Sequence, residues 1–233
     1  MKIAICLSGE PRFTKESREH FNKCIAHVPH DLFIHSWSDK ALEFSDHICG
    51  AEIEPCIDFG YKRCGPVEPG LLPNNVLSQL HSISESFKLA LASDNQYDLY
   101  VRCRFDVFVG NQIQYRFLNK RATHMLPEGK NSLPRGSDLY RQNINLLPLP
   151  KDFFWVTNHY GAVVSSNLAL STLESHQKEG IVLCPEDLIF HHFAKNNLKL
   201  HYLPNNISNG LYRTNHHHGD GLVLYNRNGP YKK

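Results

Sequence analysis

Lys2-Ile3-Ala4-Ile5-Cys6-Leu7-Ser8-Gly9-Glu10-Pro11-Arg12 is an apolar run that stops at a glycine, a proline and an arginine, and the architecture of the chain follows from it. A short apolar run bounded by turn residues is typical of a strand that is buried on both faces. Thr14 to Ala26 is then expected to form a helix, and Asp31 to His35 a second buried strand. Ala51 to Phe59 alternates as a third strand does. This β-α-β order predicts a parallel sheet.

The rest of the chain continues the alternation of strands and helices. Gly60 to Asn75 is rich in glycine and proline and is expected to be a long loop or lid. Apolar residues recur at spacings of three and four between Val76 and Ala92, which predicts an amphipathic helix. Further strands are expected at Tyr97–Arg102, Thr123–Leu126, Phe153–Val156, Gly161–Ser165 and Leu198–Leu203, and further helices at Asn167–Gln177 and Pro185–Lys195.

Length and composition favour one α/β domain. The chain has 233 residues, of which 41% are hydrophobic, and no linker or internal repeat divides it. A chain of this length can bury a core without disulfides or a structural metal. We therefore expect a single domain over 1–233, with a mostly parallel, twisted sheet flanked by helices.

Cysteine usage and charge restrict the compartment and the partners. The seven cysteines are odd in number and never spaced as C-x-x-C, which favours neither a disulfide framework nor a zinc ribbon and fits a reducing compartment. The apolar run after Met1 is too short for a signal peptide, and no segment approaches the ~20 apolar residues of a membrane span. A cytoplasmic protein is expected. The net charge of +2 argues against nucleic acid as a partner and leaves small anionic ligands.

The stretch from Tyr97 to Asp106 carries the strongest chemical signal. It is a predicted strand that ends in Arg102, Arg104 and Asp106. Ligands of open α/β sheets bind outside the carboxyl ends of strands, so these side chains are expected at the crevice. Arginine can fork onto phosphate oxygens, and one aspartate together with substrate phosphates can hold Mg²⁺ or Mn²⁺. The alternative is an ion-pair network at a strand end, without a ligand.

In their order along the chain, four segments resemble a family of bacterial and viral glycosyltransferase-like proteins of the nucleotide-diphosphate-sugar type, which have the GT-A fold. The segments are Lys2 to Arg12, Asp31 to Trp37, the pair Ser78-Gln79 with Ser82 to Ser86 on a predicted helix, and Tyr97 to Asp106. The resemblance covers about the first half of the chain. It implies that the first strand meets the nucleotide and that Asp106 meets the metal of the diphosphate. Arg104 stands where a D-x-D motif has its first aspartate.

The resemblance divides the chain into two functional halves. Residues 1–110 are expected to hold the nucleotide-sugar donor, and 111–233 to hold the acceptor and the C-terminal tail. Ser8, Gly9 and Arg12 follow the first strand, where backbone could approach the nucleotide and Arg12 could reach a phosphate. A tight turn without ligand contact is the alternative there.

Acidic residues near a later helix are the acceptor-side candidates. Glu186 and Asp187 lie in the first turn of the predicted helix after Cys184, where the helix dipole alone would favour carboxylates. One of them could instead remove the proton of an acceptor hydroxyl. In the tail, His217 is a candidate metal ligand together with Asp106, and the alternative is a solvated tail.

Trp37 and Trp155 are candidates for stacking on a sugar or a base, although aromatic residues more often belong to the core.

These observations predict a glycosyltransferase that moves a sugar from a nucleotide-diphosphate sugar to a glycan or another hydroxyl acceptor, with Mn²⁺ or Mg²⁺ as the expected cofactor. Two alternatives stay open. A sugar nucleotidyltransferase would show a glycine-rich, lysine-containing loop after its first strand, and Gly9-Glu10-Pro11-Arg12 has neither feature. A catalytically inactive carbohydrate-binding or scaffold protein could retain the same fold.

Overall fold

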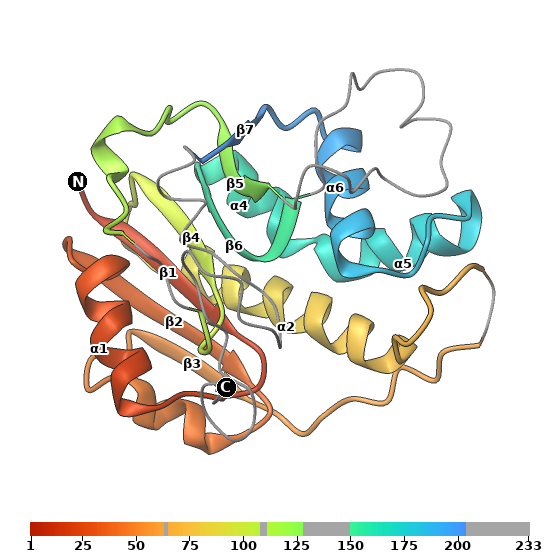
Figure 1. The fold of residues 1–233 in the computed structure, drawn as a ribbon, viewed down its shortest axis with the longest axis horizontal. Coiled ribbons are helices and arrows are strands. Elements are labelled where there is room, and N and C mark those ends of the chain that lie inside the picture. Colours follow the sequence, from red (N-terminus) through yellow and green to blue (C-terminus); the bar gives the residue numbers. More distant parts are fainter. Residues whose placement is uncertain (63–64, 108–110, 128–149, 204–233) are drawn as a thin grey trace, which may run out of the picture.

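A seven-stranded sheet forms the centre of the protein (Figure 1), in the order β3-β2-β1-β4-β6-β5-β7. The computed structural model describes residues 1–62, 65–107, 111–127 and 150–203. The strands are β1 (Ile3–Ser8), β2 (His30–Ser36), β3 (Gly50–Ile53), β4 (Leu99–Cys103), β5 (Thr123–Pro127), β6 (Pro150–Thr157) and β7 (Leu200–Tyr202).

The sheet is mostly parallel, as the sequence predicts. β1 pairs in parallel with both β2 and β4, and β2 pairs in parallel with β3. β6 runs antiparallel to β4 and to β5, and β5 is parallel to β7. The carboxyl ends of β1, β2, β3 and β4 therefore lie at one edge of the sheet, where β6 begins. Ligands of such sheets bind at this edge.

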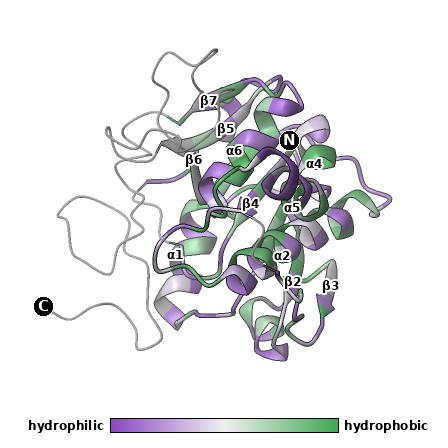
Figure 2. Ribbon diagram, turned by 90° about the vertical axis from the view of Figure 1, so that its right-hand side faces the viewer, coloured by the Kyte–Doolittle hydropathy of each residue, from purple (hydrophilic) through white to green (hydrophobic). Residues whose placement is uncertain are grey.

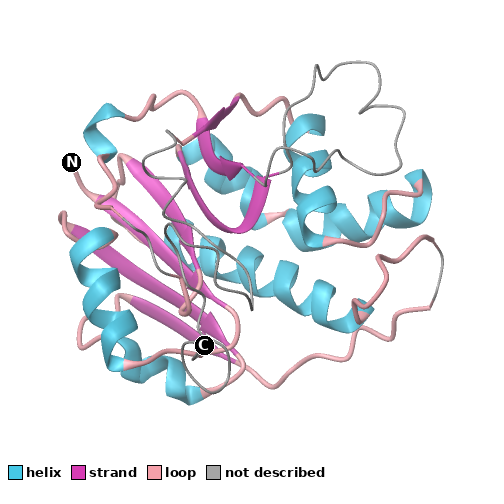
Figure 3. Ribbon diagram, in the orientation of Figure 1, coloured by secondary structure: helices cyan, strands magenta, loops and turns pink. Residues whose placement is uncertain are grey.

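Helices cover both faces of the sheet (Figure 3), and they are α1 (Lys15–Cys24), α2 (Pro73–Leu91), α4 (His159–Ser166), α5 (Leu168–Glu179), α6 (Pro185–Lys195) and the 3-10 helices η1 (Asp39–Phe44) and η2 (Tyr115–Phe117). Thr14, where the sequence predicts a helix to begin, caps α1, because its hydroxyl accepts the Ser17 N–H at 3.2 Å. Within the described residues, no helix has both the length and the apolar composition that crossing a bilayer requires.

The alternation of side chains along the strands divides the core in two. Ile3, Ile5 and Leu7 of β1 pack with α1 on one face of the sheet. Ala4 and Cys6 of the same strand pack with α2, α4, α5 and α6 on the other face. Figure 2 shows hydrophobic and hydrophilic residues mixed along α2, as expected for a helix with one buried side.

The prediction of a strand over Gly161–Ser165 is wrong, because these residues belong to helix α4. The side chain of Asn158 starts the helix by accepting the Gly161 N–H at 2.9 Å. A short apolar run fits a strand and one side of a helix equally well, and here the cap decides. The expected third strand is also shorter than predicted, since β3 ends at Ile53.

Gly161 explains how closely α4 approaches the sheet. A Cβ atom at this position would lie 1.8 Å from Thr157 Oγ1 and 3.0 Å from Thr123 Oγ1, two hydroxyls that bond to each other at 2.6 Å. A side chain fits there only if Thr157 or the backbone moves. The α4 start, β5 and β6 are thus locked together at this point.

Gly161→Ala should lower the stability of the protein by roughly 1–3 kcal/mol, because an overpacked contact forces the backbone apart. In a helix without this contact the same change would be stabilising by up to about 1 kcal/mol. Urea unfolding of the two proteins measures the difference. An alanine variant as stable as the parent would contradict the close packing of α4 on β6.

Candidate functional site

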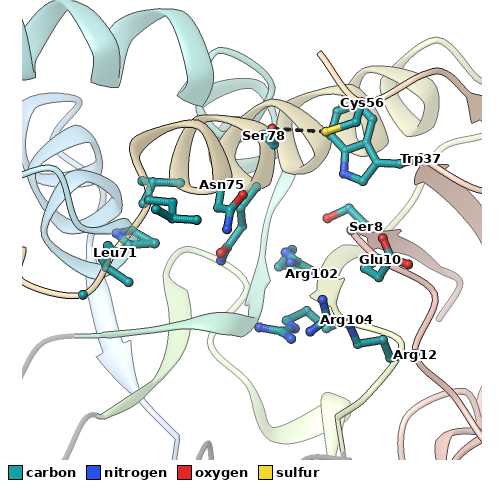
Figure 4. A pocket seen from close by; sticks show the side chains of 16 residues that line it. Ser8, Glu10, Arg12, Trp37, Cys56, Leu71, Asn75, Ser78, Arg102 and Arg104 are labelled. Carbon is teal, nitrogen blue, oxygen red and sulfur yellow. Dashed lines mark hydrogen bonds between the residues drawn. The ribbon is translucent and has the colours of Figure 1, made fainter. Parts of the chain in front are cut away.

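A cavity of about 510 Å³ opens at the carboxyl edge of the parallel strands (Figure 4). Its walls come from the ends of β1, β2 and β4, from the loop before α2, from the first turns of α2 and from the start of α6. The lining residues are Ser8, Gly9, Glu10, Arg12, Trp37, Cys56, Gly70, Leu71, Leu72, Asn75, Val76, Ser78, Gln79, Arg102, Arg104 and Pro185. The volume is in the ~300–1,000 Å³ range of small-molecule sites.

The end of β1 forms a sharp turn against the cavity. Gly9 has a φ of 104°, a backbone conformation that residues with a side chain rarely adopt. Its N–H donates to Ser82 Oγ at 2.9 Å, and its carbonyl accepts the Ser36 hydroxyl at 3.0 Å. The buried hydroxyl of Ser8 lines the cavity and has no hydrogen-bond partner among the described residues. The turn therefore offers a hydroxyl to a ligand.

Three arginines make the cavity basic. Arg102, on β4, is 1% exposed, and its guanidinium lies 5.9 Å from the ring centroid of Trp155. Arg12 follows β1 and Arg104 follows β4, and Figure 4 shows all three side chains on the side of the cavity opposite α2. Glu10 is the one carboxylate among the described lining residues. The cavity is thus suited to an anion.

Asp106 holds Arg104 in place. Arg104 Nε donates to Asp106 Oδ1 at 2.8 Å, and Arg104 Nη2 donates to Asp106 Oδ2 at 2.6 Å. Such a two-pronged pair fixes the plane of the guanidinium. The carboxylate is buried and is not part of the cavity lining, whereas Arg104 is. The geometry of Asp106 is that of a residue positioning Arg104, and its role as a metal ligand stays a prediction.

The two tryptophans have different environments. Trp37 lines the cavity and stacks on the His81 ring, with 5.9 Å between ring centroids and 19° between planes. Trp155 is fully buried and lies parallel to Phe87 at 6.1 Å. The core interpretation therefore fits Trp155, and Trp37 is the one placed to meet a ligand.

The acidic pair of α6 lies beside the cavity. Pro185 is the lining residue that α6 contributes, and Glu186 and Asp187 follow it as buried residues of the first helical turn. The Cys184 thiol donates to Glu186 Oε2 at 3.1 Å, and burial together with the Glu186 charge raises the pKa of that thiol. The thiol is therefore protonated and serves as a donor.

The structure brings together five of the six donor-side residues that the sequence singled out, and the sixth, Asp106, is buried outside the cavity lining. Ser8, Gly9, Arg12, Arg102 and Arg104 all line one cavity, although β1 and β4 are far apart in the chain. His217 lies outside the described residues.

Sequence reasoning missed most of the contribution of α2. Asn75, Ser78 and Gln79 line the cavity, and Ser82 holds Gly9. These four polar residues recur at spacings of three, one and three along a helix whose other inner positions are apolar. Such a polar stripe follows the helical period, and that period was the signal available in the sequence.

Comparison with known proteins finds likeness in structure and none in sequence. No protein-family profile matches the sequence, and no curated protein is found similar to it. The structure is similar to a crystal structure of mouse xyloside xylosyltransferase 1 in its apo form, with 10% sequence identity and a TM-score of 0.49, over 88% of this chain and 86% of the mouse chain. This likeness concerns overall fold, and the architecture given above rests on the strand pairing itself.

Asp106→Asn should lower the free energy of unfolding by about 1–3 kcal/mol, because the neutral amide turns an N–H toward the Arg104 guanidinium and loses a charged acceptor. The same substitution at the exposed Asp94 is the matched control and should change stability by less than ~0.5 kcal/mol. Thermal and urea unfolding of both variants measure the effect. Equal stability of the two variants would contradict the positioning role.

Proposed function

We propose that this protein binds a nucleotide-diphosphate sugar in the arginine-lined cavity and transfers the sugar to a hydroxyl of a glycan or another acceptor. The observation that carries the proposal is the convergence of Arg12, Arg102 and Arg104 on one cavity at the carboxyl edge of parallel strands. The resemblance of the N-terminal half to nucleotide-sugar glycosyltransferases with the GT-A fold points the same way. Uracil, guanine and other bases offer a ring that Trp37 could stack on.

The arginines supply what the reaction needs at the donor. As the bond between sugar and diphosphate breaks, negative charge grows on the departing diphosphate and positive charge on the sugar. Guanidinium groups already fixed in place stabilise that negative charge without a reorganisation cost at the moment of reaction. Arg104 is fixed by Asp106, and Arg102 is buried in the sheet. These two are the proposed diphosphate ligands, and Arg12 adds a third charge.

The described part of the cavity fits arginine-based charge neutralisation better than a shell of hard-metal ligands. Mg²⁺ and Mn²⁺ are held through carboxylates and substrate phosphates. Among the described lining residues the only carboxylate is Glu10, and both oxygens of Asp106 accept from Arg104. The expected Mn²⁺ or Mg²⁺ is therefore a separate proposal, and no step of the reaction is assigned to it.

The acceptor side is proposed to lie at the start of α6. A hydroxyl that attacks the sugar has to lose its proton, and a carboxylate near the cavity can take it. Glu186 and Asp187 are one and two residues past Pro185, which lines the cavity. Both are buried.

A second candidate function is binding without turnover. Asp106 is engaged by Arg104, and the described cavity lining is basic, so the site could hold a sugar nucleotide as a ligand only. Both functions require nucleotide binding. They differ in whether the bond between sugar and diphosphate is cleaved.

Nucleoside diphosphates should raise the melting temperature. A ligand at about 100 times its Kd adds ~2.7 kcal/mol to stability, which corresponds to roughly 5–10 °C for a chain of this length. Arg12→Gln should weaken binding by about 10- to 100-fold, since it removes a hydrogen bond to a charged group without disturbing the Arg104–Asp106 pair. Arg121→Gln, on an exposed residue outside the cavity lining, should leave the affinity unchanged.

The panel should cover uridine, guanosine, cytidine and thymidine diphosphates, each measured with Mn²⁺, with Mg²⁺ and with a chelator. An unchanged melting temperature with every nucleoside diphosphate would rule out the proposed donor site. Equal binding with and without the metals would rule out a metal requirement and would leave the arginines as the proposed diphosphate ligands. Slow release of free sugar from one nucleotide sugar would separate an enzyme from a protein that only binds.

Substitution of the α6 acids tests the acceptor side. If either residue removes the hydroxyl proton, Glu186→Gln or Asp187→Asn should lower the transfer rate by at least ~10²-fold at unchanged donor affinity. If the pair only complements the helix dipole, each variant should lose about 0.3–1 kcal/mol of stability and keep its rate. Transfer kinetics and urea unfolding on the same samples distinguish the two.

A further inference from the structure

A second cluster of polar side chains lies beside the cavity, next to Trp37. It consists of His35 on β2, Glu54 just after β3 and His81 on α2. Glu54 Oε1 is 3.0 Å from His35 Nε2 and 2.6 Å from His81 Nε2. One carboxylate oxygen thus faces two imidazole nitrogens from two other elements. The proposed sugar transfer uses none of these three residues.

The hydrogen bonds of Ser82 hold the ring of His35 in place. The Ser82 hydroxyl donates to the His35 carbonyl at 3.2 Å and accepts the Gly9 N–H at 2.9 Å. His35 Nδ1 is also 2.9 Å from Ser82 Oγ. Nδ1 of the ring is therefore engaged by Ser82, and Nε2 is the nitrogen that faces Glu54.

His35 Nε2 faces the carboxylate of Glu54 at 3.0 Å. The His35 side chain is fully buried and that of Glu54 is partly buried, so the two atoms meet away from bulk solvent. A neutral imidazole nitrogen and a carboxylate oxygen that converge in this way can both coordinate one metal ion.

The surroundings of His81 also suit a metal ligand. Its Nδ1 lies 3.8 Å from Glu85 Oε1, one helical turn along α2, and Trp37 stacks on its ring. Histidines that bind metals commonly direct their second nitrogen to a carboxylate or to a hydrogen-bond acceptor. Glu85 is the carboxylate near Nδ1 of His81, and Ser82 is the hydrogen-bond partner of Nδ1 of His35.

We propose that His35, Glu54 and His81 bind a Zn²⁺ ion. Two imidazole nitrogens and one carboxylate oxygen are a typical zinc ligand set, and the fourth position of the tetrahedron is left to water. In a tetrahedral site the ligand atoms are about 3.3 Å apart. The three ligand atoms here lie within 4.8 Å of one another, so small side-chain shifts suffice.

The ion would hold β2, β3 and α2 together and, through Ser82, would fix the Gly9 turn. It is distinct from the proposed donor metal, and the zinc proposal does not rest on sugar transfer.

Metal content is the first test. The run His216-His217-His218 can chelate metals by itself, so the protein is measured with these three residues changed to alanine. That protein should retain one tightly bound Zn²⁺ per chain by elemental analysis after dialysis. Glu54→Gln and His81→Gln should each weaken zinc binding by at least ~100-fold. Glu52→Gln, which removes a neighbouring exposed carboxylate, should bind as the parent does.

Two measurements keep the test decisive if a variant fails to fold. Co²⁺ in place of Zn²⁺ should give the intense visible absorption of a tetrahedral site. Imidazole nitrogen NMR of the otherwise unsubstituted rings should show that the Nε2 signals of His35 and His81 shift on zinc addition. Absence of bound zinc, an octahedral cobalt spectrum, or Nε2 signals that do not respond would each overturn the proposal and leave a hydrogen-bonded cluster.

Discussion

The hydroxyl of Ser82 connects the elements that form both sites. It accepts the Gly9 N–H at the end of β1, donates to the His35 carbonyl of β2, and is itself carried by α2. Because Gly9 adopts a φ of 104°, the turn after β1 needs a partner of this kind to stay in one conformation. The cavity has its shape only while this turn holds, since Ser8, Gly9 and Arg12 all line it. One side chain thus sets the positions of a cavity wall and of a histidine ring.

The balance of charge at the cavity decides how a diphosphate would be held. A D-x-D pair would place two carboxylates near the phosphates and would need a divalent cation to reverse their charge. Arg104 occupies the first position of that pattern, and Asp106 at the second position is used to orient it. A guanidinium carries its own positive charge, so the same phosphate oxygens can be bound without an ion.

The sequence predicts much of this fold because the strands of a parallel sheet are continuous apolar runs. β1, β2 and β4 were predicted in this way, and α1 and α6 were predicted as helices that begin near Thr14 and at Pro185. The α4 helix was missed because five small and apolar residues fit either period, and only the Asn158 cap and the contact with Thr157 distinguish them. The reversed direction of β6 has no local signal, since it depends on which strand it pairs with.

Parts of the site, like parts of the fold, can be predicted from the sequence, and other parts depend on contacts between elements. The sequence places arginines at strand ends, and the topology of a parallel sheet then brings those ends together. Nothing in the spacing of Arg104 and Asp106 says whether the two side chains face each other, because they follow the strand in a turn. The polar face of α2 is informative in a different way. Ser84 and Ser86 bond back to carbonyls of their own helix, which buried serines commonly do. Ser84 also accepts the Ala169 N–H of α5, a residue outside the cavity lining. Ser82 instead donates to the His35 carbonyl of β2 and accepts the Gly9 N–H, and these contacts mark it as part of the site.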